Sequence, residues 1–242
     1  MAYTRMLEDD APHYDALDST GQAYARMLFF CLWPLGGGFS SYAQGFETLR
    51  RQAAFRDELR QILAYSLERT EHYPIPLIGA HSTIPLTVHA YYSREEILPA
   101  LGQAAVDGFK PGHFREGVKW CAGISTDALL ITLEKDDRDF SPQTRYKDYA
   151  LSPEQFHWES QNQTSESSPT GQRYQNHKKL GSHVLLFVRR YKSTDIGGPQ
   201  PWMLLGPAEY VSHEGSNPMG IVWKLQHPLP ADVWTYSAIT GG

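Results

Sequence analysis

The sequence has very little cysteine: its 242 residues contain only Cys31 and Cys121. Two cysteines are too few for a disulfide framework, and neither lies in the C-x-x-C spacing of a zinc or redox motif, so we expect both to be core thiols. The chain also lacks an apolar run of about 18 residues, as a membrane-spanning helix would need. Residues 1–15 have neither the basic start nor the apolar centre of a signal peptide. The sequence therefore predicts a globular, cytoplasmic protein with no membrane partner.

Catalytic motifs are equally scarce. The chain has no G-x-S-x-G nucleophile elbow, no H-E-x-x-H zinc motif and no dinucleotide fingerprint. The glycines of Pro34–Gly38 lack the Gly-Lys-Ser/Thr ending that a phosphate loop requires, so this segment predicts a turn. Three histidines of the central region, His157, His177 and His183, form no recognised ligand spacing with a cysteine or a carboxylate. We therefore expect a non-catalytic protein with no metal and no cofactor.

One pattern keeps a metal-dependent nuclease as an alternative. Asp127 precedes an expected strand, and Glu134 and Lys135 follow at its end. A nuclease core of this type needs a carboxylate, one spacer residue and a lysine, and here the spacer is missing. Because neighbouring residues of a strand point to opposite faces, Glu134 and Lys135 could not share one site. Nuclease activity is the weaker hypothesis for this reason.

The chain is short of positive charge, with a net charge of −5. This balance argues against a protein that coats nucleic acid nonspecifically, because such binding depends on many lysine and arginine contacts to phosphate. The exception is segment 160–192, where six lysines and arginines and the single acid Glu166 leave a charge of +5, against −10 for the remainder. A basic segment on an acidic body suits a protein that contacts one anionic partner with one face. The alternative is that these charges point in different directions and are solvated.

Two regimes of hydrophobic spacing divide the chain. Within residues 1–80, apolar residues recur at spacings of three and four over Gln22–Leu32 and Phe46–Leu67, which predicts amphipathic helices in a helical connector or docking region. The segment Tyr73–Gly79 contains two prolines and a glycine and marks the expected boundary. Residues 81–242 are expected to form a barrel-like α+β DNA-recognition domain, with a curled mixed sheet or small barrel.

The second regime consists of strand-like runs joined by glycine and proline turns. Before them, Ser93 and Glu96 form a capping-box signature, which predicts a short helix. The strands are expected at Gly117–Ala122, Ala128–Glu134, Lys147–Leu151, His183–Tyr191, Trp202–Ser212 and Ile221–Leu225.

A polar stretch, Ser152–Lys179, carries the candidate binding residues. Ser152 and Ser168 are each followed by a proline, the arrangement of a helix start, so we expect two short helices, the first of which carries Phe156–Trp158. The N-terminus of a helix exposes N–H groups that bind anions such as the phosphates of DNA. The residues expected to contact the DNA backbone are Thr170, Arg173, Lys178 and Lys179.

Aromatic and amide side chains in and beside this stretch could bind a base. A base rotated out of a duplex needs flat side chains on which to stack and polar groups that read its edge. The candidate base-binding residues are Trp158, Tyr149 and Tyr146 for stacking, and Gln161 and Asn162 for reading. This hypothesis requires the ring of Trp158 to face a cavity open to solvent. The alternative is that Trp158 packs in the core with Phe156 and Tyr174.

Several ordered motifs lie between Pro85 and Trp234. They are Pro85–Ile97, Phe114–Gly117, Leu129–Leu133, Phe156–Gln161, Ser168–Tyr174, Leu204–Ala208 and Pro228–Trp234. Together they resemble a family of uncharacterised domains found at the C-terminal end of bacterial DEAD/DEAH-type helicase proteins, some of which begin with a phospholipase D-like nuclease. Residues 1–80 resemble the helical connector that follows the helicase lobes in those proteins.

The resemblance implies a role in bacterial phage defence. Proteins of this kind include ATP-dependent (type IV) restriction enzymes that cut DNA containing modified cytosine, with this domain as the expected target reader. It is similar to PUA/SRA-like barrel domains, which flip 5-methylcytosine out of DNA. The partners it implies are modified double-stranded DNA and helicase or nuclease domains in cis or in trans. The alternative is a protein-interaction module that docks a helicase or nuclease without reading DNA itself.

Overall fold

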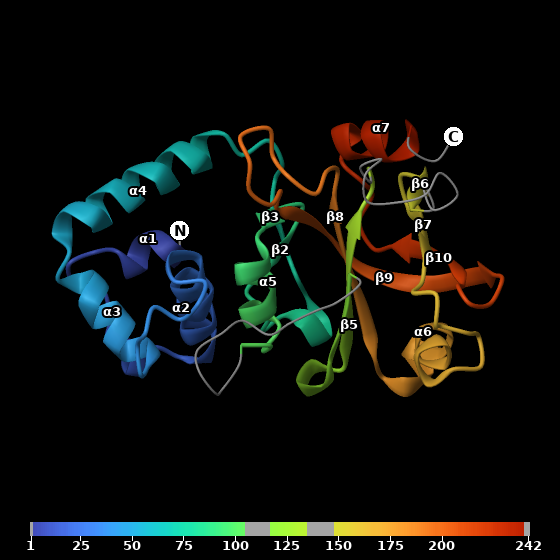
Figure 1. Cartoon of the computed structure of the whole chain (residues 1–242), viewed down its shortest axis with the longest axis horizontal. Helices are drawn as coiled ribbons and strands as arrows, with labels where there is room; N and C mark the ends of the chain where they lie inside the picture. Colours follow the sequence, from blue (N-terminus) through green and yellow to red (C-terminus); the bar gives the residue numbers. More distant parts are fainter. Residues whose placement is uncertain (1, 105–116, 135–147, 240–242) are drawn as a thin grey trace. The chain divides into compact units, whose positions relative to one another are not determined.

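The structure is a computed structural model that describes residues 2–104, 117–134 and 148–239 (Figure 1). The chain divides into two compact units: Met1–Leu86 with Tyr92–His113, and Thr87–Tyr91 with Phe114–Gly242. The first unit therefore includes a segment that follows the proline-rich stretch from which we predicted the boundary. The reason is that the helix after Ser93 packs against a helix near the N-terminus.

Helices dominate the first unit, and the helix start predicted at Ser93 is confirmed. Its elements are α1 (Ala2–Met6), η1 (Tyr14–Ala16), α2 (Ser19–Leu32), α3 (Tyr42–Arg50), α4 (Ala53–Glu68), β1 (Ile75–Pro76), η2 (Gly79–His81) and α5 (Arg94–Ala100). Asp18 caps α2 by accepting a hydrogen bond from the N–H of Gly21. The capping box of Ser93 and Glu96 is present at the start of α5. Within the described ranges, none of the helices combines the length and apolarity needed to cross a bilayer.

The helical structure predicted over Phe46–Leu67 is confirmed, but it is divided into two helices because the chain bends between α3 and α4. Gln52 has φ −107° and ψ 70°, outside the helical region. The bend directs Arg50 and Arg56 to one N-terminal segment, where they donate to the carbonyl oxygens of Ala11 and Leu7 at 3.0 and 2.9 Å. The apolar period continues through the bend, so the sequence pattern does not reveal it.

One mixed sheet forms the second unit. Its strands include β4 (Val118–Cys121), β5 (Thr126–Thr132), β6 (Tyr149–Ser152), β7 (Gln155–Glu159), β8 (His183–Arg189), β9 (Trp202–Glu214) and β10 (Gly220–Leu225), with η3 (Ala122–Ile124) after β4. The short strand β2 (Thr87–Val88) is not part of this sheet. The path is β4-β5-β8-β9-β10-β7-β6, and β3 (Tyr91–Tyr92) also pairs with β9. β5 and β8 are parallel, whereas β4–β5 and β8–β9 are antiparallel. The α+β class and the mixed sheet are confirmed, but among the described strands the sheet does not close into a barrel.

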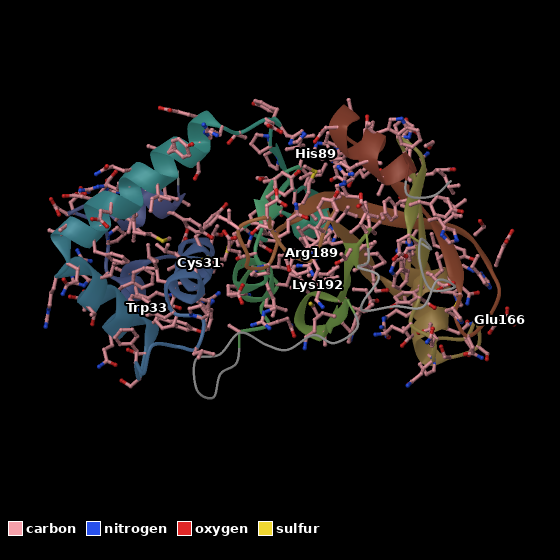
Figure 2. The ribbon with its side chains drawn as sticks, turned by 45° about the horizontal axis from the view of Figure 1, so that its top comes forward. Cys31, Trp33, His89, Glu166, Arg189 and Lys192 are labelled. Carbon is pink, nitrogen blue, oxygen red and sulfur yellow. The ribbon has the colours of Figure 1, made fainter. Side chains whose placement is uncertain are left out.

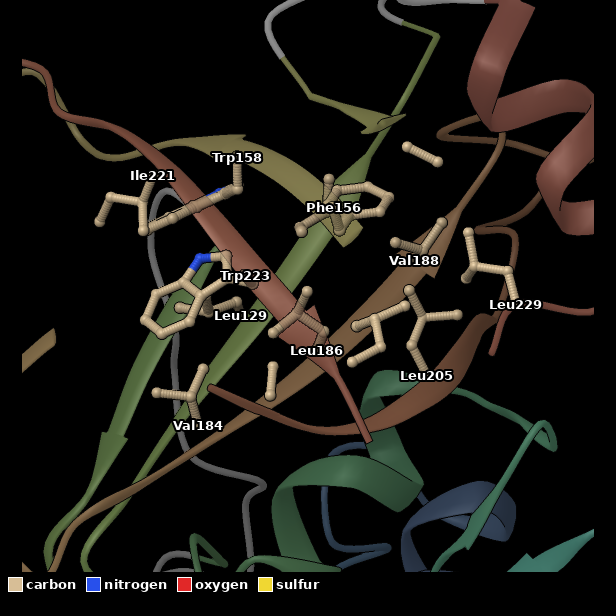
Figure 3. Close-up of a cluster of buried hydrophobic side chains, with 14 of the residues drawn as sticks. Leu129, Phe156, Trp158, Val184, Leu186, Val188, Leu205, Ile221, Trp223 and Leu229 are labelled. Atoms are coloured by element: carbon tan, nitrogen blue, oxygen red, sulfur yellow. The ribbon is translucent and has the colours of Figure 1, made fainter. Parts of the chain in front are cut away.

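One face of this sheet holds the main hydrophobic core. Alternate residues of β5, β7, β8 and β10 project to the same side, as the two-residue period of a strand requires (Figure 3). The fully buried members include Leu129, Phe156, Leu186, Leu205, Ile221 and Trp223. Helix α6 (Pro169–Leu180) adds Tyr174, and α7 (Ala231–Ile239) adds Val233. Helix α6 confirms the start expected at Ser168, whose side chain accepts from the N–H of Gly171 at 3.1 Å.

The helix predicted after Ser152 is wrong, since these residues form β7. Exposure alternates along Gln155–Glu159, with Phe156 and Trp158 buried and their neighbours half-buried. Ser152 and Pro153 instead make the turn into that strand, where the N–H of Glu154 donates to the Ser152 hydroxyl at 3.2 Å. A serine followed by a proline starts turns as well as helices, so the strand period decides between them here.

Gly171 lies where α6 packs closely against the preceding loop. A Cβ atom at this position would lie 2.0 Å from the carbonyl oxygen of Ser165. We expect Gly171→Ala to lower the free energy of unfolding by about 1–3 kcal/mol, because backbone atoms must move to relieve the overlap. Gly123→Ala is the matched control, since a Cβ there meets nothing within 4 Å. Urea denaturation measures both, and equal stabilities of the two variants would contradict this account.

Candidate nucleic-acid interface

Trp158 lies in the core. Its side chain is 5% exposed and lies among the other buried residues of the sheet (Figure 3). It meets the Tyr174 ring edge to face, with 5.7 Å between ring centroids. The alternation of β7 explains this position, because Trp158 faces the same side as Phe156 and pairs across the strands with Ile221 of β10. The expectation that its ring faces a cavity open to solvent is therefore wrong. Stacking a base on Trp158 would require the core to open.

Tyr149 lies on the other side of the sheet. It pairs with His157 across β6 and β7, and the two rings stack with centroids 4.8 Å apart at an interplanar angle of 20°. His157 and Trp158 are neighbours in one strand, so they point to opposite faces. Tyr149 and Trp158 consequently do not line one site. The third predicted stacking residue, Tyr146, lies outside the described residues.

The predicted reading residues, Gln161 and Asn162, follow β7 in a turn. Asn162 is exposed and Gln161 is half-buried. The turn is fixed to the start of β10, because the N–H of Ser160 donates to the carbonyl of Met219 at 2.8 Å and its hydroxyl accepts from the Met219 N–H at 2.9 Å. These two side chains therefore sit on a well-anchored turn, at the end of the strand whose Trp158 is buried.

Arg173 is committed to a buried carboxylate. Its Nε and Nη2 donate to the two oxygens of Asp127 at 2.7 and 2.9 Å, and Asp127 is 1% exposed. The guanidinium also lies 4.3 Å from the centroid of the Trp120 ring. Burial raises the pKa of the Asp127 carboxyl, and the bonds from Arg173 oppose that rise. This geometry assigns Arg173 to the joint between α6 and β5 rather than to a DNA phosphate.

The other predicted phosphate contacts do not form one cluster. Thr170 lies in the first turn of α6, whereas Lys178 and Lys179 lie in its last turn, about 12 Å further along the axis. Lys178 pairs with Glu209 of β9 at 2.7 Å, with both side chains largely exposed. Lys179 is exposed at the end of the helix. The N-terminus of α6 and its basic end are thus separate surfaces.

A different basic surface lies where β8 ends. The segment 189–201, here called the basic arm, comprises the last residue of β8 and the loop that leads to β9; it contains Arg189, Arg190 and Lys192 and one acid, Asp195. Arg189 and Lys192 are labelled in Figure 2. The cations of this segment contributed to the charge estimated from the sequence, but they were not among the predicted site residues.

Arg189 has only neutral partners among the described residues. Its Nε donates to the hydroxyl of Thr132 at 2.9 Å and its Nη1 to the carbonyl of Gln200 at 3.1 Å, while its guanidinium lies 3.8 Å from the centroid of the Trp202 ring. Burial without a carboxylate lowers the pKa of Arg189 to about 10. Its neighbour Arg190, by contrast, pairs with Glu134 at 2.6 Å.

The same ion pairs argue against the nuclease alternative. Asp127 is held by Arg173 and Glu134 by Arg190, so both carboxylates that suggested this chemistry already have cationic partners. Lys135 lies outside the described residues. In the part of the chain that the structure describes, no three histidine, cysteine, aspartate or glutamate side chains gather in a way that could hold a metal ion.

A family described as a domain of unknown function, DUF3427, matches residues 86–237. The chain belongs to this family. The match agrees with the span predicted from sequence motifs, Pro85–Trp234, and covers the strands from β4 to β10, α6 and the basic arm. No curated protein sequence matches the chain.

The pair of Arg173 and Asp127 leads to the first prediction at this interface. We expect Arg173→Ala to lower the free energy of unfolding by about 3–5 kcal/mol, because it leaves the Asp127 carboxylate buried without its partner. Lys179→Ala removes an exposed charge from the same helix and should change that free energy by less than about 0.5 kcal/mol. Urea denaturation of both variants measures the difference. Wild-type stability of Arg173→Ala would show that the pair does not hold α6.

His177 leads to a prediction about pH. Its Nε2 accepts from the N–H of Tyr210 at 3.1 Å and its Nδ1 donates to the carbonyl of Ser182 at 3.3 Å, so the buried ring is neutral. Burial lowers the pKa of His177 below its ordinary value. The unfolded chain therefore takes up this proton first as the pH falls below about 6.5. We expect the free energy of unfolding to decrease over that window.

A conservative variant isolates this contribution. Glutamine also offers one donor and one acceptor but does not titrate, so His177→Gln should lose less stability between pH 7.5 and pH 5.5 than the wild-type chain. Urea denaturation at the two pH values gives the comparison. An identical pH dependence in both proteins would show that His177 is not the source of the loss of stability at low pH.

Proposed function

We propose that this DUF3427 domain is a non-catalytic target-recognition module that binds double-stranded DNA in a bacterial restriction system. The observation that carries the proposal is the basic arm, in which three cations, Arg189, Arg190 and Lys192, accompany the exposed ring of Tyr191 on a chain of net charge −5. Lysine and arginine contacts to phosphate supply most of the affinity of proteins for DNA. A local basic segment on an acidic chain favours contact through one surface.

The restriction context rests on the resemblance to domains that follow DEAD/DEAH-type helicases. In that context the helicase or nuclease acts in cis or in trans, and this domain supplies the target. Reading of 5-methylcytosine by base flipping is the finer part of the proposal, and its support is the resemblance to PUA/SRA-like domains. Buried Trp158 does not supply the stacking platform, so a flipped base would have to be held by other residues.

Binding to matched duplexes tests the proposal. We expect a gel shift at low salt, tighter binding to a 5-methylcytosine duplex than to the same unmodified duplex, and a binding constant that falls steeply with salt. Lys192→Gln should weaken binding to both duplexes and reduce the salt slope by about 0.9, the value for one lost phosphate contact. Lys224→Gln, which removes an exposed lysine of β10, is the control.

The possible results separate the two parts of the proposal. Equal affinity for the two duplexes would reject the reading of modified cytosine. The absence of a shift at low salt would reject DNA binding altogether.

A protein-interaction module is the second candidate, and helix α4 favours it. Over its 16 residues only Arg56 is buried, and Phe55, Ile62, Tyr65 and Leu67 are between 46% and 59% exposed. Exposed apolar groups of this kind often mark a protein contact. Salt-insensitive binding of a helicase or nuclease partner, without a DNA shift, would favour this function over the first.

A further inference from the structure

Arg189 differs from the other partly buried arginines of this chain. Arg56 pairs with Asp9 and Arg173 with Asp127, each at 2.7 Å. Arg189 is half-buried as well, yet within the described residues its hydrogen-bond partners are a hydroxyl and a carbonyl, and no carboxylate lies within ion-pair distance. Removing a cation from water without a counter-charge is costly. Among the described residues, only neutral hydrogen-bond partners and the ring of Trp202 therefore offset the burial of Arg189.

The guanidinium retains hydrogen-bonding capacity. A guanidinium has five N–H groups in a planar fork, and the bonds to Thr132 and Gln200 use one on Nε and one on Nη1. Three N–H groups remain, one on Nη1 and two on Nη2. Two such groups can bind two oxygens of a phosphate or carboxylate group.

The surroundings fix the orientation of this group before any ligand binds. Thr132 stands next to Arg189 in the parallel register of β5 and β8, and the Trp202 ring lies against the guanidinium plane. Gln200 is held in turn, because its side-chain oxygen accepts from the N–H of Tyr191 at 2.7 Å. Orientation in the free protein lowers the entropic cost of binding.

The charge around this site favours an anion with more than one negative oxygen. Lys192 lies three residues from Arg189 along the chain, and of the two acids Glu134 and Asp195 the first is already paired with Arg190. A phosphate group can take two bonds from the guanidinium and also benefit from Lys192. A carboxylate carries a single negative charge, which Arg189 alone would balance. The further cations of the basic arm therefore favour a phosphate over a carboxylate.

We propose that Arg189, oriented by Thr132, Gln200 and Trp202, is a preformed receptor for a phosphate group. The source of that group is a backbone phosphate of DNA, and this part rests on the function proposed above. Free inorganic phosphate presents the same oxygens and is the simplest probe of the receptor. Arg189 would then be the anchor of the interface, and the remaining cations of the basic arm would strengthen it.

Two arms of one experiment test the receptor and its ligand, both on the full chain. In the first, inorganic phosphate is titrated against chloride at constant ionic strength while the melting temperature is followed. We expect phosphate to raise the melting temperature of the wild-type chain, to do so less for Arg189→Lys, which keeps the charge without the fork, and to have no effect on Arg189→Gln. Lys224→Gln, at an exposed lysine of β10 outside the basic arm, is the control and should respond like wild type.

The second arm measures the affinity for a fixed duplex at one salt concentration. Loss of a charge-assisted contact should weaken DNA binding by Arg189→Gln about tenfold or more, with a smaller loss for Arg189→Lys. Circular dichroism of both variants shows whether they are folded, and Arg189→Lys keeps the test valid if Arg189→Gln is not.

Each outcome decides one part. An equal phosphate response in wild type and in folded Arg189 variants overturns the receptor. A receptor that responds to phosphate, combined with DNA binding unaffected by Arg189→Gln, overturns DNA as the source of the phosphate while DNA binding itself stands. A phosphate response without any DNA binding by the wild-type chain supports the receptor and rejects the proposed function instead.

Discussion

The buried pair of Asp127 and Arg173 is the interaction on which the second unit depends. A carboxylate that is 1% exposed needs a partner. Among the described residues α6 brings that partner, so this helix must lie where Arg173 reaches β5. In that position Tyr174 enters the core beside Trp158 and Trp223. His177, one turn further on, bonds the backbone of β9. The placement of α6 thus seals the aromatic residues that a base-binding pocket would have used.

Ion pairing also decides which cations remain for a ligand. Arg173 and Lys178 were predicted as phosphate contacts because they belong to the helix whose N-terminus was expected to bind an anion. Each instead meets an acid from a strand, Asp127 or Glu209. Arg189 belongs to the same segment and meets none among the described residues. A cation that a fold neutralises contributes to stability, whereas one that stays unneutralised can contribute to binding. The candidate site therefore lies at the end of β8 and not at α6.

Local patterns predicted most of the fold and little of the site. The strands β4, β5, β6, β8, β9 and β10 were found because alternation and turn residues are local signals, and the capping box of α5 and the serine cap of α6 were found for the same reason. β7 was missed because a serine and a proline outweighed a two-residue period only five residues long. The partners of Arg173 and Arg189 are set by tertiary structure across 46 and 57 positions, so no local pattern could separate the two roles.

The distribution of charge would direct a DNA duplex to the basic arm. Outside segment 160–192 the chain carries −10, so most of its surface repels a DNA backbone at distances up to about one Debye length. At the end of α6, Glu209 opposes Lys178 and weakens that surface as a competing contact. In the proposed interface, the anchored guanidinium of Arg189, which has no carboxylate partner among the described residues, is the point where attraction would persist after desolvation. Because short-range hydrogen bonds at Arg189 are screened less than the exposed charges, they would hold the register of a duplex that the arm attracts.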